Sequence, residues 1–295
     1  MHDFPCLGDA RAGTVLVTGA TGNVGREIVA RLVTHGAAVR RLDRRQVESH
    51  PGVESVVGDL TDPASVREAL VGVDTVFLVW PLLDCAAAQP LITELAAAAP
   101  RLVYLSSTAI DDDADRQSDP IVQVHADMEA LLHSGELCLT VMRSDTLASN
   151  TRGWSAQLRS GDVVRGPNIA RTAVVDERDV AAAAVAVMLG HHNGFVRDTY
   201  LLTGPELLSR AEQVNILGAE LGRDLRFEAV PADLARARML ADGRPEPLVD
   251  ALIAASVRRH ESDLITDHVE LLTGQPSGTF AQWVIDNRGE FGRQP

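Results

Sequence analysis

Short apolar runs alternate with amphipathic stretches through the first half of the chain. Strands are predicted at residues 15–17, 38–43, 53–57, 75–79, 101–105 and 137–142. Apolar residues at helical spacing predict helices over 23–35, 62–70, 84–99 and 120–134. Repeated strand–helix alternation needs right-handed crossovers. The pattern therefore predicts an α/β fold with a doubly wound parallel sheet.

The second half is less regular. Residues 150–172 mix Gly, Arg and Asn and are predicted to form a loop-rich region. Helices are expected over 179–189, 209–221, 231–241 and 246–260, and strands over 199–202 and 225–230. Ser209 and Glu212 form a capping-box pattern, and Gly222 follows the helix that they open. These elements predict a small lobe beyond the sheet.

Glycines at 19, 22 and 25 stand between the first predicted strand and its helix. Such glycines allow a tight turn, a close approach of backbone N–H groups to a pyrophosphate, and close helix–strand packing. The helix N-terminus adds free amides and a positive dipole end. The motif predicts a dinucleotide-binding Rossmann domain over residues 1–150, with later strands from about 173–202. Residues 151–295 are then a partly interleaved substrate-binding lobe.

Composition narrows the function classes. A net charge of −14 argues against nucleic-acid binding. No run approaches the ~20 apolar residues of a membrane span, and the N-terminus lacks the pattern of a secretory signal. Cys6, Cys85 and Cys138 are few and scattered, which favours a reducing cytoplasm over a disulfide framework. His191 and His192 form the one close histidine pair, so no metal site is expected.

These motifs resemble the NmrA-like group of atypical short-chain dehydrogenases/reductases. Thr18-Gly-Ala-Thr-Gly-Asn-Val-Gly25 has the glycine spacing of that group, and the segments 58–63, 103–107, 202–205 and 279–283 are similar to its recurrent segments. The resemblance covers roughly residues 13–290. It implies NAD(P) binding, although the group includes both reductases and proteins that only sense the cofactor.

The resemblance also implies the cofactor contacts. The pyrophosphate would be lined by Gly19, Thr21, Gly22, Asn23 and Val24. The adenine would meet Asp59 and Leu60, although Asp59 could instead be a turn residue before the next helix. The nicotinamide ribose would be bordered by Leu78, Val79 and Trp80.

The choice between NAD and NADP stays open in the sequence. Asp43 ends the second strand 24 residues after Gly19, where a carboxylate can accept from both ribose hydroxyls and repel a 2′-phosphate. Arg44 and Arg45 follow, and an arginine there could bind that phosphate through a bidentate fork. Arg44 matches a position that often selects NADP in the group, whereas a solvated surface run is the alternative.

The usual catalytic pattern of the superfamily is missing. Its reductases generally use a serine, a tyrosine and a lysine four residues after the tyrosine. This chain contains no lysine, and neither Tyr104 nor Tyr200 begins the helix at 120. Ile121 and His125 take the tyrosine and lysine places instead. An ordinary carbonyl reductase is therefore not expected.

Several polar residues remain as candidates. Ser106 and Ser107 end a central strand, where open α/β sheets bind ligands. His125 should face the cleft and could hold the ribose or relay a proton, but a half-buried structural histidine is an equal alternative. The candidate substrate contacts are Arg143, Asn150 and Trp154.

The favoured function is an NAD(P)(H)-dependent oxidoreductase acting on a small quinone-like or enone-like molecule, with secondary metabolism as one setting. The reduced product of such an acceptor can be protonated by water, so the protein need only orient and bury the reactants. A non-catalytic redox sensor and a non-redox lyase, cyclase or isomerase stay open as alternatives. A cytoplasmic homodimer is expected.

Overall fold

The central element is a seven-stranded parallel sheet of order β3-β2-β1-β4-β5-β6-β9. The computed structural model describes residues 13–48, 50–98, 100–135, 137–191 and 195–292, so Cys6 and His192 lie outside the described residues. The strands are β1 (Thr14–Thr18), β2 (Ala38–Asp43), β3 (Val53–Val57), β4 (Val73–Leu78), β5 (Arg101–Ser107), β6 (Cys138–Ser144) and β9 (Thr199–Leu202). The predicted doubly wound sheet is confirmed.

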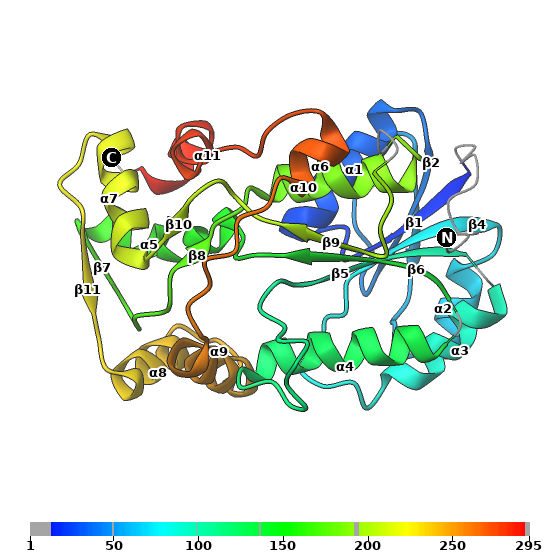
Figure 1. The fold of residues 1–295 in the computed structure, drawn as a ribbon, viewed down its shortest axis with the longest axis horizontal. Helices are drawn as coiled ribbons and strands as arrows, with labels where there is room; N and C mark the ends of the chain where they lie inside the picture. The colour runs from blue at the N-terminus through cyan, green and yellow to red at the C-terminus, as the bar shows by residue number, and fades with distance from the viewer. Residues whose placement is uncertain (1–12, 49, 99, 136, 192–194, 293–295) are drawn as a thin grey trace.

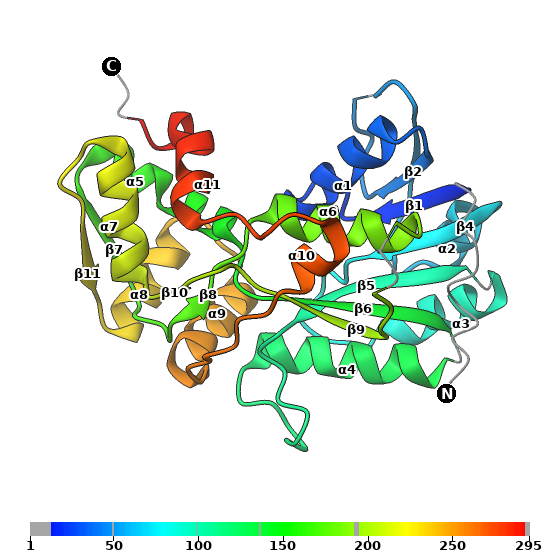
Figure 2. The same ribbon diagram turned by 45° about the horizontal axis from the view of Figure 1, so that its top comes forward.

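Helices cover both faces of the sheet (Figures 1 and 2). One face carries α1 (Asn23–Thr34), α6 (Glu177–Met188) and α10 (His268–Thr273). The other carries α2 (Pro63–Ala69), α3 (Ala88–Ala98) and α4 (Pro120–Ser134). The sequence prediction that a helix begins at residue 84 is wrong by one turn, because Asp84 forms a turn instead: its Oδ1 accepts from the N–H of Ala86.

The C-terminal lobe has a core of its own, built around the fully buried Trp283. Its helices are α5 (Ser155–Ser160), α7 (Arg210–Leu221), α8 (Ala232–Ala241), α9 (Glu246–Arg258) and α11 (Phe280–Asn287), with 3-10 turns η2 (Ala148–Trp154) and η3 (Arg288–Phe291). Its strands form two ribbons: β7 (Val163–Gly166) with β11 (Arg226–Ala229), and β8 (Thr172–Ala173) with β10 (Leu207–Leu208). Residues 150–172 are therefore less loop-rich than expected.

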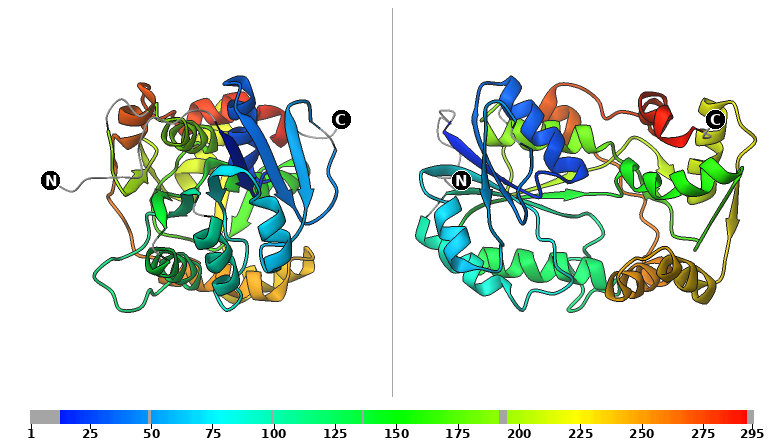
Figure 3. Two further views of the ribbon diagram at one scale, coloured as in Figure 1. Left: turned by 90° about the vertical axis from the view of Figure 1, so that its right-hand side faces the viewer. Right: turned by 180° about the vertical axis from the view of Figure 1, so that it is seen from behind.

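The two parts are joined through repeated crossings of the chain. After η2, α5 and β7 in the lobe, the chain returns to the sheet as α6 and β9, then leaves again through α7. The predicted capping box of Ser209 and Glu212 opens α7, and Gly222 ends it at φ +63°. On the other side, α9 of the lobe lies beside α4 of the Rossmann part (Figure 3). None of the described helices is both long and apolar enough to cross a membrane.

Candidate active site

The glycine-rich turn after β1 has the shape of an anion cradle. Gly19 has φ +62°, a conformation that favours glycine. A Cβ on Gly25 would lie 2.1 Å from the carbonyl oxygen of Gly19, so α1 could not approach β1 so closely with a side chain there. Gly22 is the N-cap of α1 and provides no side-chain cap, which leaves the first amides of α1 for an anion. The turn fits a dinucleotide pyrophosphate.

The side chains around this turn differ in their surroundings. Thr21 is exposed, whereas Val24 is buried in the core under α1 and can offer only its backbone N–H. Asn23 begins α1, and its Oδ1 accepts from Nη1 of Arg152 at 3.3 Å. Val79 lies against Gly19, with its Cβ 3.2 Å from the place that a Cβ on Gly19 would take.

The ends of β2 and β3 carry the expected adenosine contacts. Asp43 is buried, and its Oδ2 accepts no hydrogen bond although Nε of Arg41 lies 3.1 Å away. Burial raises the pKa of Asp43, and the charge of Arg41 offsets part of the shift. Asp43 stands at the carboxyl end of β2, where the ribose of a bound dinucleotide would lie. Arg44 and Arg45 are exposed.

Asp59 forms the turn that the sequence offered as its alternative role. Its Oδ1 accepts from the N–H and Oγ of Thr61, and these hydrogen bonds hold the pKa of Asp59 below its usual range. Its contact to adenine, and that of the half-buried Leu60, remain predictions. Leu78 and Trp80 belong to the core on the α2–α3 side of the sheet, and the indole N–H of Trp80 donates to the carbonyl of Asp84.

A cavity of about 530 Å³ opens at the carboxyl ends of β5 and β6. Four of the candidate residues line it: Ser106, Ser107, His125 and Asn150. Arg143 and Trp154 are not among its lining residues. Arg143 instead forms a bidentate ion pair with Asp112 and a second pair with Glu129, so four of its five N–H donors are already used.

His125 is paired with a tyrosine inside the protein. Its Nδ1 lies 3.1 Å from the hydroxyl of Tyr104, which is fully buried in β5. Burial is the main cause that lowers the pKa of His125 below 6.5, and burial also raises the pKa of Tyr104. Both groups are therefore neutral at pH 7. Because the Tyr104 hydroxyl has no other acceptor among the described residues, we assign it as the donor to Nδ1, which leaves the imidazole proton on Nε2.

Ser106 and Ser107 have different surroundings. The hydroxyl of Ser106 donates to Oε1 of buried Glu129 at 2.5 Å. The carboxylate of Glu129 also forms an ion pair with Arg143. Oγ of Ser107 accepts from the N–H of Ala109 and keeps its proton for a ligand in the cavity. Ser107 is therefore the more accessible donor.

The cavity also contains residues that the sequence did not single out. Asp145 follows β6 and accepts from the N–H of Thr146 at 2.6 Å, and burial raises its pKa. Arg259 follows α9 and binds Asp119, the N-cap of α4, at 2.8 Å. The Asp119-Pro120 pair carries an N-cap signal in the sequence, but nothing local to Arg259 indicates its position. This ion pair fixes the lobe beside the cavity.

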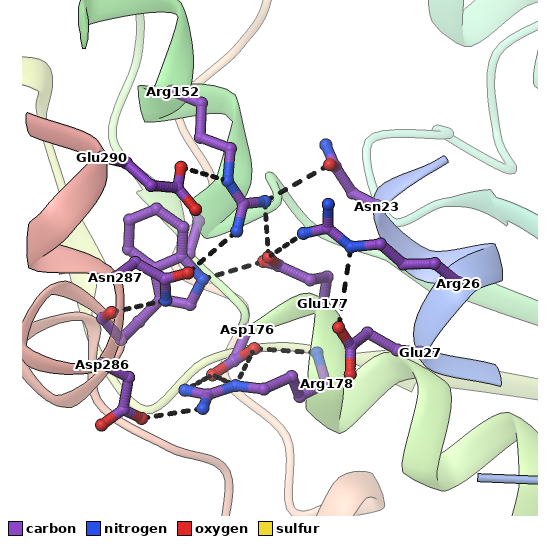
Figure 4. Close-up of polar contacts among 12 residues, drawn as sticks. Asn23, Arg26, Glu27, Arg152, Asp176, Glu177, Arg178, Asp286, Asn287 and Glu290 are labelled. Atoms are coloured by element: carbon purple, nitrogen blue, oxygen red, sulfur yellow. Dashed lines mark hydrogen bonds and ion pairs between the residues drawn. The ribbon is translucent and has the colours of Figure 1, made fainter. Parts of the chain in front are cut away.

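A second polar network joins the glycine-rich turn to the lobe (Figure 4). At its centre is Glu177, the first residue of α6, which is only 1% exposed. Its carboxylate accepts from Nη1 of Arg152 at 2.8 Å and from the indole N–H of Trp283 at 3.0 Å, and it lies 3.9 Å from Nη2 of Arg26. Helices α1, α6 and α11 thus meet at one buried carboxylate.

Comparisons with known proteins agree with this geometry. A family model described as NAD(P)H-binding matches residues 19–189. The chain is 36% identical to a (4-alkanoyl-5-oxo-2,5-dihydrofuran-3-yl)methyl phosphate reductase of Streptomyces griseus, covering 94% of this chain and 99% of the relative. It is 29% identical to an NAD(P)H azoreductase of Xenophilus azovorans, with the same shares of the two chains covered.

Solved structures share the fold. The NADPH-dependent quinone oxidoreductase of Escherichia coli, in complex with NADPH, matches with a TM-score of 0.73 at 20% identity, over 93% of this chain and 99% of that one. The two sequence relatives are reductases by name, and they favour the oxidoreductase among the functions left open by the sequence. The chain belongs to the NAD(P)H-binding family and is an NAD(P)(H)-dependent oxidoreductase of the atypical, NmrA-like short-chain type.

Proposed function

We propose that this protein reduces the conjugated double bond of a small enone, unsaturated lactone or quinone bound in the cavity at the ends of β5 and β6. The observation that carries the proposal is the neutral His125 in the cavity wall, oriented by Tyr104, in a chain that also contains an intact dinucleotide cradle. The relatives named above act on a furanone ester and on azo compounds, which are also conjugated acceptors.

The cofactor and the residues of the cavity have separate roles in the proposed reaction. NAD(P)H, when bound, supplies hydride to the acceptor. Nε2–H of His125 would donate to the carbonyl oxygen of the acceptor, where negative charge develops during reduction. Ser107 offers a second donor from the end of β5. Protonation at carbon can come from water, so the missing tyrosine and lysine are not needed.

His125→Leu is expected to lower kcat/KM for an enone or naphthoquinone by about 100-fold, as loss of an oxyanion donor does. Tyr104→Phe should cost roughly tenfold, the value of one hydrogen bond, because the imidazole proton is no longer fixed on Nε2. Steady-state oxidation of NAD(P)H measures both. His133→Leu, on the exposed face of the same helix, is the control.

The pH profile gives a second test of the same residue. Since the pKa of His125 lies below 6.5, kcat/KM should be level near neutral pH and should change only as acidification protonates the imidazole. That acidic limb should disappear in His125→Leu. Normal turnover of both His125→Leu and Tyr104→Phe would contradict the assigned role.

We also propose that Asp43 selects NAD(H) over NADP(H), because a carboxylate at the carboxyl end of β2 would accept from a ribose hydroxyl and repel a 2′-phosphate. The wild-type protein should have the higher kcat/KM with NADH, and Asp43→Ser should shift the ratio toward NADPH by about tenfold, or about 1.4 kcal/mol. Preference for NADPH in the wild type would contradict this. The cytoplasmic location and the homodimer remain predictions.

A further inference from the structure

Three arginines from separate elements of the lobe lie near one another, and one of them lines the cavity. Arg259 follows α9 and lines the cavity, Arg210 begins α7, and Arg244 lies between α8 and α9. Burial, together with like-charge repulsion from Arg244 and Arg259, lowers the pKa of Arg210 to about 10. This concentration of positive charge stands out in a chain with a net charge of −14.

The cluster has too few carboxylates for its charge. Nη1 of Arg210 donates to the carbonyl oxygen of Pro167 at 2.8 Å, and no carboxylate of the described residues pairs with Arg210 or Arg244. Nη2 of Arg244 lies 3.7 Å from the place that a Cβ on Gly153 would take, so its guanidinium reaches toward η2. Among the described residues Arg259 forms one ion pair, with Asp119, and its charge also offsets part of the raised pKa of Asp145.

A buried hydroxyl beside the cluster also lacks a partner. Thr172 lines the cavity, is 4% exposed, and its Oγ1 makes no hydrogen bond within the described part of the chain. Thr172 pairs with Leu208 in the β8–β10 ribbon, and Leu208 stands two residues before Arg210 in the sequence. Polar groups buried in this way normally have a partner. A ligand with acceptor oxygens would satisfy both the hydroxyl and the guanidinium groups.

We propose that Arg210, Arg244 and Arg259, with Thr172, bind a phosphate monoester carried by the substrate at the lobe side of the cavity. A phosphate monoester fits better than a carboxylate, because it offers three acceptor oxygens and nearly two negative charges to several guanidinium groups. The proposal rests on the proposed function for the identity of the rest of the substrate. The ester would anchor the molecule in the lobe while its conjugated ring lies by His125 and Ser107.

The test is calorimetry on the protein saturated with oxidised cofactor. The probes are a saturated butanolide methyl phosphate and the corresponding alcohol, neither of which can be reduced at a ring double bond. The ester should bind at least tenfold tighter than the alcohol, and inorganic phosphate should compete with the ester. Arg210→Gln should remove most of this difference, with Arg244→Gln as the second variant if the first does not fold.

Arg238→Gln, on the exposed surface of α8, is the matched control and should bind the ester as the wild type does. Equal affinity for ester and alcohol would overturn the proposal, as would an equal loss for both ligands in the well-folded Arg244→Gln variant. Because the probes cannot be reduced, this binding test does not depend on the reductase chemistry, which oxidation of NAD(P)H by an unsaturated acceptor tests separately.

Discussion

Gly25→Ala is expected to weaken NAD(P)H binding by at least about 100-fold, or about 2.7 kcal/mol. The new methyl group would lie 2.1 Å from the carbonyl oxygen of Gly19 and 2.8 Å from its carbonyl carbon. Both atoms belong to backbone that cannot rotate away, so α1 must shift from β1 and the amide cradle opens. Titration of NAD(P)H fluorescence on variants with native circular dichroism measures the loss.

Substitutions of two other glycines are the controls for Gly25→Ala. A Cβ on Gly22 would lie 3.1 Å from the same carbonyl oxygen, so Gly22→Ala should give a smaller loss. Gly161 has an extended backbone and nothing within 4 Å of its added Cβ, so Gly161→Ala should bind the cofactor normally. Normal binding by Gly25→Ala would show that the cradle does not hold the pyrophosphate.

Glu177→Ala should lower the free energy of unfolding by about 3–5 kcal/mol, the range for removing one partner of a buried ion pair. The change leaves the indole N–H of Trp283 without its acceptor and leaves Arg152 without its buried counter-charge. Since Arg152 also contacts Asn23, cofactor affinity should fall as well. Urea denaturation with and without NAD(P)H measures both effects.

The control for Glu177→Ala is a substitution of another ion-pair partner of Arg152. Glu290 also pairs with Arg152, but its side chain is 40% exposed. Glu290→Ala should therefore cost less than about 1 kcal/mol, as exposed ion pairs do. Similar costs for Glu177→Ala and Glu290→Ala would mean that Glu177 is not the joint between the Rossmann part and the lobe.

The sheet could be predicted because its signals are local. Strands β1, β4, β5 and β6 contain apolar runs next to helices in the sequence, and periodicity alone identifies such pairs. The lobe could not be predicted in the same way. Strand β7 pairs with β11 about 60 residues later, and α5 and α10 span six residues each, too few to show a period.

The functional site was also predictable only where its signals are local in the sequence. The glycine turn is visible because its chemistry lies within a few residues, and His125 was found from its place in the helix. The sequence does not reveal the role of Tyr104, because that role depends on how the residues of β5 are aligned with those of α4. Residues two apart on β5, Tyr104 and Ser106, face residues four apart on α4, His125 and Glu129. Arg143 was expected at the substrate, but Asp112 and Glu129 occupy its guanidinium.

The return of the chain to the sheet as α6 and β9 limits how this protein can be dissected. A fragment ending near residue 150 would leave β6 as an unprotected edge strand, and it would uncover the apolar surface of α1 that α6 buries. Gene fusions, truncations and domain exchanges must therefore keep both halves in one polypeptide, since neither half contains all the surfaces that it needs to stay in solution.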